Sequence, residues 1–144
     1  MKYIFTAFML FLPFGLFAQT LNEGENIKAI SLKDQFEKNL TVSAETKQII
    51  VAFTKDQGAQ VKTFLDANPN YLAEQKALYF MDVTSVPGMV MSMFMLPKFK
   101  NYTYPVGLIE EKEALAYFPK KEGNITLITL DNLKVTAITF KESL

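Results

Sequence analysis

The chain has 144 residues, 15 lysines against 15 acidic residues, and no cysteine, histidine, arginine or tryptophan. This length suits one domain with its own core. Near-neutral charge without arginine argues against a nucleic-acid interface, which needs a concentrated basic face. The missing residue types exclude Ser-His, Cys-His and thiolate chemistry.

Residues 1–18 have the three-part pattern of a secretory signal peptide: one lysine, an apolar run and a small residue before the cleavage point. The apolar run extends from Tyr3 to Leu12, and Ala18 precedes the expected cut. Leu16 stands where a small residue is usual, so an uncleaved membrane anchor is the alternative. The sequence therefore predicts an exported protein, periplasmic or secreted, with no membrane span once the leader is removed.

The mature chain begins with a polar stretch, 19–28, which predicts a loose N-terminal lead to a single domain over 29–144. Short strands are expected at 30–32 and 40–42, on either side of a polar turn. The run 48–53 is continuously apolar and rich in β-branched residues. Such a run is typical of a strand that is covered on both faces in a parallel sheet.

Two β-α units follow from the pattern. Apolar residues recur at helical spacing over 61–65, and an Asn-Pro-Asn sequence at 68–70 ends that helix. A second apolar strand is expected at 77–83, followed by a helix over 87–96 with a proline in its first turn. Consecutive β-α units imply parallel strands joined by right-handed crossovers.

The last third of the chain changes character. The segment 102–109 alternates between apolar and polar residues, and short apolar runs follow at 114–118, 125–130 and 135–140. Threonine- and isoleucine-rich runs between tight polar turns are typical of antiparallel hairpins. The sequence therefore predicts an α/β fold with a mixed central sheet, in which a β-α-β-α half precedes a β-β half.

This element order is that of the thioredoxin-like fold, and the residues resemble the family too. Val51-Ala52-Phe53 is similar to the strand before the redox motif of thioredoxins, and Tyr104-Pro105-Val106 to the cis-proline that begins the third strand. Three further motifs resemble those of small exported bacterial thioredoxin-like proteins of unassigned function: Leu32-Lys33-Asp34-Gln35-Phe36, Asp82 to Pro87, and Leu96-Pro97-Lys98. The usual final helix of the family is expected to be replaced by further strand.

The redox motif itself is missing. The two Cys-x-x-Cys positions fall on Gly58 and Val61, within about two residues, and the chain contains no thiol. Disulfide exchange requires an attacking thiolate and a resolving thiol. We therefore expect a redox-inactive binding or accessory module of the cell envelope, not an enzyme, with no cofactor and with an envelope protein or peptide as its partner. A hydrolase without the usual signature residues is a third hypothesis.

The expected binding site is a groove at the carboxyl ends of the parallel strands, where open α/β sheets place ligands. A proline opposite this edge leaves backbone groups free to pair with an extended peptide. The candidate groove residues are Asp56, Gln57, Gly58, Asp82, Tyr104 and Pro105. For the two aspartates the alternative role is helix capping and loop solvation, and for the proline it is a trans bond entering an edge strand.

Four methionines, Met89, Met91, Met93 and Met95, suggest an alternative function as a periplasmic Cu(I)-binding carrier. Thioethers are soft ligands that suit Cu(I). On a helix, however, the four side chains divide into two pairs on different faces. Methionine is also an adaptable filler of apolar cores, so packing is the competing interpretation.

We predict that export removes the leader after Ala18, because this is the first small residue beyond the apolar run. Intact-mass measurement of the exported protein should give a chain that starts at Gln19. A full-length species retained in the membrane would contradict the prediction and support the anchor.

Overall fold

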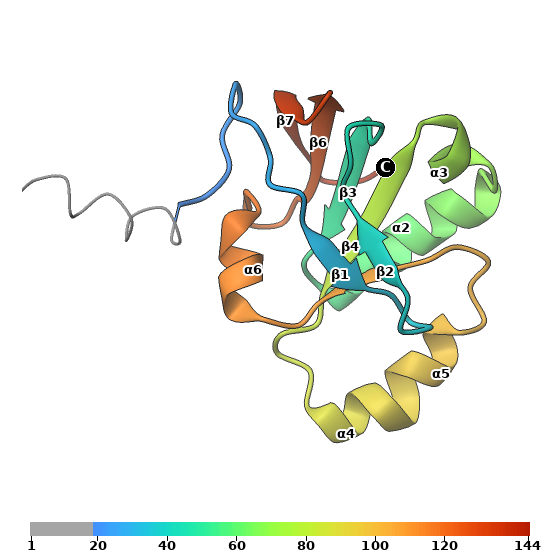
Figure 1. The fold of residues 1–144 in the computed structure, drawn as a ribbon. Coiled ribbons are helices and arrows are strands. Elements are labelled where there is room, and N and C mark those ends of the chain that lie inside the picture. Colours follow the sequence, from blue (N-terminus) through green and yellow to red (C-terminus); the bar gives the residue numbers. More distant parts are fainter. Residues whose placement is uncertain (1–18) are drawn as a thin grey trace, which may run out of the picture.

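The computed structural model describes residues 19–144, and the predicted signal peptide lies outside them. A central sheet of five strands has the order β5-β4-β3-β6-β7 (Figure 1). The strands β3, β4 and β5 are parallel, β6 is antiparallel to β3, and β7 is antiparallel to β6. The bounds are β3 (Gln48–Ala52), β4 (Ala77–Asp82), β5 (Gly107–Ile109), β6 (Ile125–Asp131) and β7 (Lys134–Lys141).

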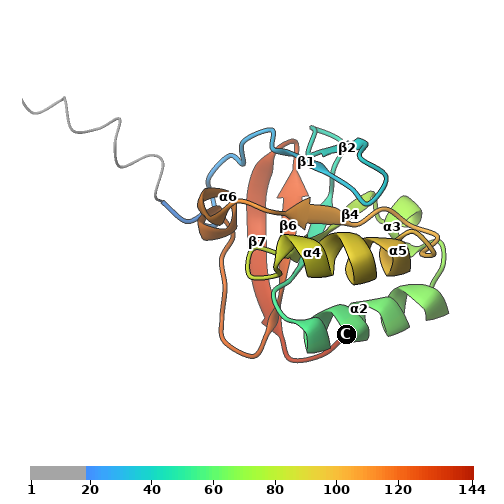
Figure 2. The same cartoon turned by 90° about the horizontal axis from the view of Figure 1, so that it is seen from below.

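The helices α2 (Lys55–Ala67) and α3 (Tyr71–Glu74) connect β3 to β4. A continuous helix over 88–99 then connects β4 to β5, and it consists of α4 (Gly88–Val90), the π-helical turn η2 (Met91–Met95) and α5 (Leu96–Phe99). Both connections are right-handed crossovers that step the same way across the sheet, so α2 and the 88–99 helix cover the same face. Figure 2 shows α2 beside α4 and α5 on that face.

The opposite face of the sheet is covered by the antiparallel pair β1 (Ser31–Lys33) and β2 (Asn39–Thr41), and by α6 (Lys112–Tyr117) (Figure 2). The side chains of β3 alternate between the two cores. Ile49 and Val51 join the core under β1 and α6, whereas Ile50 and Ala52 join the core under α2. The central strand is therefore buried on both faces, as its continuously apolar run predicts.

The π-helical turn has a local cause. Pro97 has no N–H, and its ring crowds the carbonyl group one turn earlier. The preceding turn is widened, and the Leu96 N–H bonds to the carbonyl of Met91, five residues back. Such π-turns are most often single insertions within an α-helix, and they are frequent at functional sites.

Two predictions for the last third were wrong. Most of the run 114–118 belongs to the helix α6, which ends at Tyr117, because Lys-Glu-Ala-Leu-Ala is rich in helix formers and a short apolar run does not distinguish helix from strand. In the alternating segment 102–109, only β5 is a strand, and it is parallel to β4. The hairpin β6–β7 is as predicted, and no helix follows β7 in the described chain.

The N-terminal segment, predicted to be loose, is packed against the C-terminal part of the domain, at the start of β7. Leu21 and Ile27 are buried. The N–H groups of Gly24 and Ile27 donate to the carbonyls of Val135 and Leu133, at 2.8 and 2.7 Å. The packing of this segment could not be predicted because its two buried residues are separated by polar ones, and its hydrogen bonds are made with residues that are distant in the sequence.

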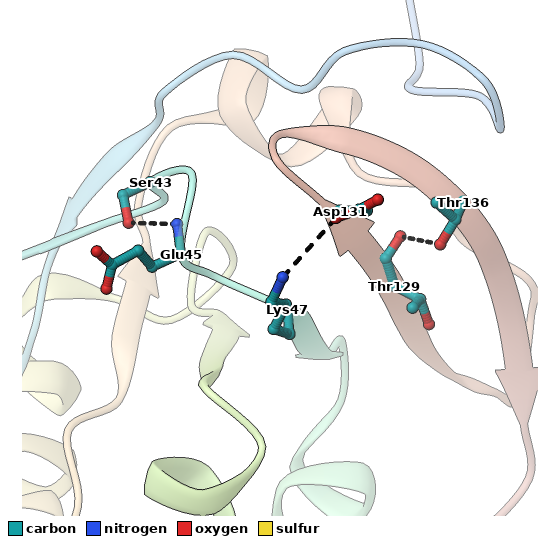
Figure 3. Close-up of polar contacts among 6 residues, drawn as sticks. All are labelled: Ser43, Glu45, Lys47, Thr129, Asp131 and Thr136. Atoms are coloured by element: carbon teal, nitrogen blue, oxygen red, sulfur yellow. Dashed lines mark hydrogen bonds and ion pairs between the residues drawn. The ribbon is translucent and has the colours of Figure 1, made fainter.

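Figure 3 shows three polar contacts near the amino end of β3. Lys47 and Asp131 form an exposed ion pair at 3.8 Å between the start of β3 and the end of β6. The Glu45 N–H donates to the Ser43 hydroxyl at 3.3 Å, and the Thr136 hydroxyl donates to the Thr129 carbonyl at 3.3 Å. Exposed pairs of this kind contribute little to stability, so we assign them to local geometry.

The buried side chain of Gln35 holds the loop that leads into β5. Its Nε2 donates to the carbonyl oxygens of Phe99 and Tyr104, at 3.1 and 2.8 Å. Its Oε1 accepts from the Val106 N–H at 2.7 Å. The same amide therefore bonds on both sides of Pro105, which has no N–H of its own.

We predict that Gln35→Leu lowers the free energy of unfolding by about 2–4 kcal/mol, because it leaves buried backbone groups without partners. Chemical denaturation of the mature protein measures this. The matched control is Gln60→Leu at an exposed position of α2, which should change stability by less than about 0.5 kcal/mol. Equal effects of the two substitutions would contradict the assigned role of Gln35.

Candidate functional site

A groove of 820 Å³ lies between α2 and the 88–99 helix, over β4. Its floor consists of Tyr79, Met81, Phe99 and Tyr102. The wall from α2 is small or polar, and the wall from the 88–99 helix is apolar. The wall and rim residues used below are Lys55, Gly58, Ala59, Lys62, Asp82, Val86, Val90, Phe94, Met95 and Lys98.

Two of the six predicted groove residues, Gly58 and Asp82, line this groove. Gly58 lies in α2 against Met81, whose methyl carbon would be 2.5 Å from a β-carbon at this position. Asp82 accepts hydrogen bonds from the N–H and the hydroxyl of Thr84, at 2.8 and 2.7 Å. Its carboxylate therefore serves the loop after β4, which is the alternative role considered for it.

The other residues near the start of α2 have local roles. Thr54 caps the helix, and its hydroxyl accepts from the Gln57 N–H at 3.1 Å. The buried Gln57 side chain accepts from the Phe53 N–H at 2.8 Å. Asp56 is exposed in the first helical turn, where a negative charge is favourable. These contacts begin the helix and do not form a catalytic pair.

Of the two forms considered for Pro105, the structure has the trans form, and the predicted position of Pro105 opposite Asp56 was wrong. The Tyr104–Pro105 bond is trans. Gly107 lies beside Phe80, and Phe80 beside Val51, in parallel register. Pro105 therefore lies at the amino ends of these strands, whereas the loop that contains Asp56 follows the carboxyl end of β3. The two sides of the predicted peptide groove therefore lie at opposite ends of the strands, so they do not form a groove.

The segment before β6, not Pro105, lies beside the loop after β3. Because β6 is antiparallel to β3, with Thr126 opposite Val51, its preceding residues return to the carboxyl edge of β3. Lys120 Nζ lies 5.4 Å from the centre of the Phe53 ring. The residue directly before β6 is the buried Asn124, whose side chain donates to the Glu122 carbonyl at 2.9 Å.

Three tyrosines lie together beside and beneath the groove, with ring centres 5.3 Å apart for Tyr102 and Tyr104 and 6.3 Å apart for Tyr79 and Tyr104. Burial raises the pKa of Tyr79 and of Tyr104 well above the usual value, and neighbouring tyrosines raise both further. Burial also raises the pKa of Tyr102, against the opposing effect of Lys62. The cluster is therefore uncharged at neutral pH.

Lys62 links the polar wall of the groove to this cluster. Its Nζ donates to Asp66 Oδ2 at 2.6 Å and lies 5.2 Å from the centre of the Tyr102 ring. The hydrogen bond to Asp66 raises the pKa of Lys62. This ammonium group is therefore a permanent positive charge beside the groove.

The four methionines divide into two pairs, as the helical spacing predicts. Met89 and Met93 are 71% and 59% exposed, whereas Met91 and Met95 are half-buried against the core under α2. The thioethers therefore do not converge on one point. Within residues 19–144, no group of three or more aspartate, glutamate, histidine or cysteine side chains is placed to hold a metal ion.

No protein-family model matches the chain, and no curated protein sequence matches it. Solved structures do match. The peroxidoxin BcpB from Mycobacterium tuberculosis gives a TM-score of 0.55 at 17% identity, over 85% of this chain and 87% of that one. The thioredoxin domain of a thiol-disulfide oxidoreductase from Bacteroides vulgatus gives 0.53 at 13% identity, over 85% and 91%. A conserved protein of unknown function from Bacteroides fragilis gives 0.53 at 10% identity, over 86% and 93%.

The fold is thioredoxin-like. In this thioredoxin-like chain no side chain supplies a thiolate, so the disulfide chemistry of cysteine-containing thioredoxins is impossible. The Gly58 position of the expected motif faces the Met81 side chain. No helix within residues 19–144 has the length and apolar character that a membrane crossing requires.

The sequence did not reveal the residues that form most of the groove. Lys55, Lys62, Val90 and Phe94, which line the groove, were not among the predicted site residues. A signal was present, because Val90 and Phe94 are four residues apart and share a helical face. It was hidden because the 88–99 helix is apolar on several faces.

We predict that stability falls as pH rises above about 10, the usual pKa of tyrosine. Above this pH the unfolded chain has lost tyrosine protons that the folded chain retains at Tyr79 and Tyr104, so unfolding is favoured. Each such tyrosine contributes up to about 1.4 kcal/mol per pH unit. Denaturation curves between about pH 8 and about pH 11, a range that extends below and above this pKa, measure the slope.

The matched variant for this prediction is Tyr79→Phe, which removes one titrating group from the core. Its stability should depend less steeply on pH in the alkaline range than that of the wild type. An identical alkaline slope for the two proteins would contradict the prediction.

Proposed function

We propose that the protein is a redox-inactive, exported binding module of the cell envelope, and that its binding site is the groove between α2 and the 88–99 helix. One observation supports this most directly. Phe94 is 66% exposed at the lip of a hollow whose floor is apolar. Contiguous apolar surface of this kind is characteristic of interaction sites in soluble domains.

The chemistry of the groove supports binding in place of catalysis. Its carboxylate, Asp82, is occupied by Thr84. Its tyrosines are held protonated by burial, so they are poor bases at neutral pH. Within residues 19–144, none of the rim lysines is hydrogen-bonded to a hydroxyl group that it could activate as a nucleophile. We therefore propose that the module holds a ligand or a partner segment and does not transform it.

We predict that Phe94→Ser reduces capture of the native ligand or partner from the envelope fraction by about tenfold or more, because a buried phenyl contributes about 1.5–3 kcal/mol. Immobilised mature protein, followed by mass spectrometry of the bound material, measures the loss. The matched control is Phe36→Ser, since Phe36 is 46% exposed on the β1–β2 turn, away from the groove. Equal capture by the wild type and Phe94→Ser would refute the groove as the binding site.

The alternative function, a periplasmic Cu(I) carrier, is favoured by the exposure of Met89 and Met93 one helical turn apart. We expect two thioethers without a third ligand to bind Cu(I) only weakly. Exchange of both residues for leucine, a swap that costs under about 1.5 kcal/mol each in a packed site, should remove this weak binding. The same exchange at Met91 and Met95 should not. Titration against a Cu(I) chelator measures both, and tight one-to-one binding lost in the first variant would favour the carrier.

A further inference from the structure

We propose that the groove binds a single-chain anionic amphiphile, with its acidic head at Lys62 and Lys98 and its apolar chain along Phe94 and Val90. This inference rests on the proposed function of the groove as a binding site, and it specifies the ligand class. Three features of the groove support it: the positive charge at one end, the apolar wall and floor, and the size of the hollow.

The positive charge is concentrated at one end of the groove. The helices α2 and 88–99 both leave the carboxyl edge of the sheet, so they run in the same direction (Figure 2). Lys62 and Lys98 lie in the later part of their helices and both line the groove. They therefore lie toward the same end, away from Asp82.

The charge at this end is only partly neutralised, because Asp66 pairs with Lys62. Ion pairs among residues 19–144 are limited to Lys47–Asp131 and Lys62–Asp66. Lys98 therefore has no acidic partner there. At this end, Lys62 and Lys98 face the single carboxylate of Asp66, whereas at the other end Lys55 is accompanied by Asp56 and Asp82. An anionic head group is thus favoured at the Lys62 and Lys98 end.

The rest of the groove is suited to an apolar chain. Phe94, Val90 and Met95 form one wall, and Tyr79 and Met81 lie on the floor. The exposed ring of Phe94 would lose contact with water when a chain lies against it, which is favourable in proportion to the apolar area covered. The Tyr102 hydroxyl, held protonated, is available near Lys62 as a hydrogen-bond donor to the head group.

The size of the hollow favours a monomeric ligand over a membrane surface. A volume of 820 Å³ lies within the range of small-molecule sites, about 300–1,000 Å³. Such sites are mostly apolar and contain a few polar groups that orient the ligand. A bilayer would bind an apolar surface that projects outward, whereas Val90, Phe94 and Met95 border a depression, and the exposed Met89 and Met93 do not line it. We therefore assign the site to a free amphiphile such as a fatty acid.

The test is an amide NMR titration of the mature protein with dodecanoate, below its micelle concentration. The cationic ligand dodecyltrimethylammonium supplies the same chain with the opposite charge, and the neutral dye Nile red serves as an uncharged apolar ligand. We expect dodecanoate to shift the signals of groove residues and to bind about tenfold or more tightly than the cationic ligand, because hydrogen bonds to charged groups contribute about 1.5–3 kcal/mol.

The double variant Lys62→Gln and Lys98→Gln should lose this preference while it still binds Nile red. The charge-matched control, Lys33→Gln and Lys38→Gln, changes two exposed lysines at the β1–β2 pair and should retain the preference. Vesicles of an anionic phospholipid should not bind the wild type.

Several outcomes would overturn the inference. Equal affinity for the two charged ligands, or an unchanged preference in the Lys62 and Lys98 variant, would refute the anionic head. Binding to vesicles without binding to dodecanoate would assign the surface to membranes. If Nile red binds but no charge preference exists, the ligand class is wrong and the proposed binding function stands. If no apolar ligand binds and Phe94→Ser captures envelope material as well as the wild type, the proposed function fails as well.

Discussion

The position of the groove depends on one buried amide. Gln35 reaches from the β1–β2 turn to backbone groups of Phe99, Tyr104 and Val106, which lie 64 to 71 residues later in the chain. These bonds fix the end of the 88–99 helix and the entry to β5 at the same time. Phe99 and Tyr102, which belong to the floor of the groove, lie within the segment that Gln35 holds. The face of the sheet opposite the groove thereby determines the shape of the groove.

Much of the fold could be predicted because its signals are local. The buried strand β3, the β-α-β-α order and the β6–β7 hairpin follow from apolar runs and turn residues. The errors have a different origin. Helix α6 and strand β5 are short, so their patterns are ambiguous, and the attachment of the N-terminal segment depends on bonds to β7. A pattern read along the chain contains no information about partners a hundred residues away.

The candidate site could be predicted less well, for a related reason. The family resemblance indicated Pro105 as the residue opposite the loop after β3. However, Pro105 precedes β5, which is an edge strand, and the segment that lies beside the loop after β3 precedes β6. Gly58 and Asp82 do lie in the groove, yet one is covered by Met81 and the other bonds to Thr84. The residues that give the groove its character, Lys62, Lys98 and Phe94, come from two helices whose packing no local pattern specifies.

The attachment of the N-terminal segment to β7 has a consequence for biogenesis. The segment that carries the buried Leu21 and Ile27 is held to residues 133–135, because the N–H groups of Gly24 and Ile27 donate to the carbonyls of Val135 and Leu133. This contact therefore joins residues near the beginning of the described chain to residues near its end. If the protein is exported amino end first, as we propose, this attachment forms only after the final hairpin has emerged, and contacts so distant in sequence form slowly.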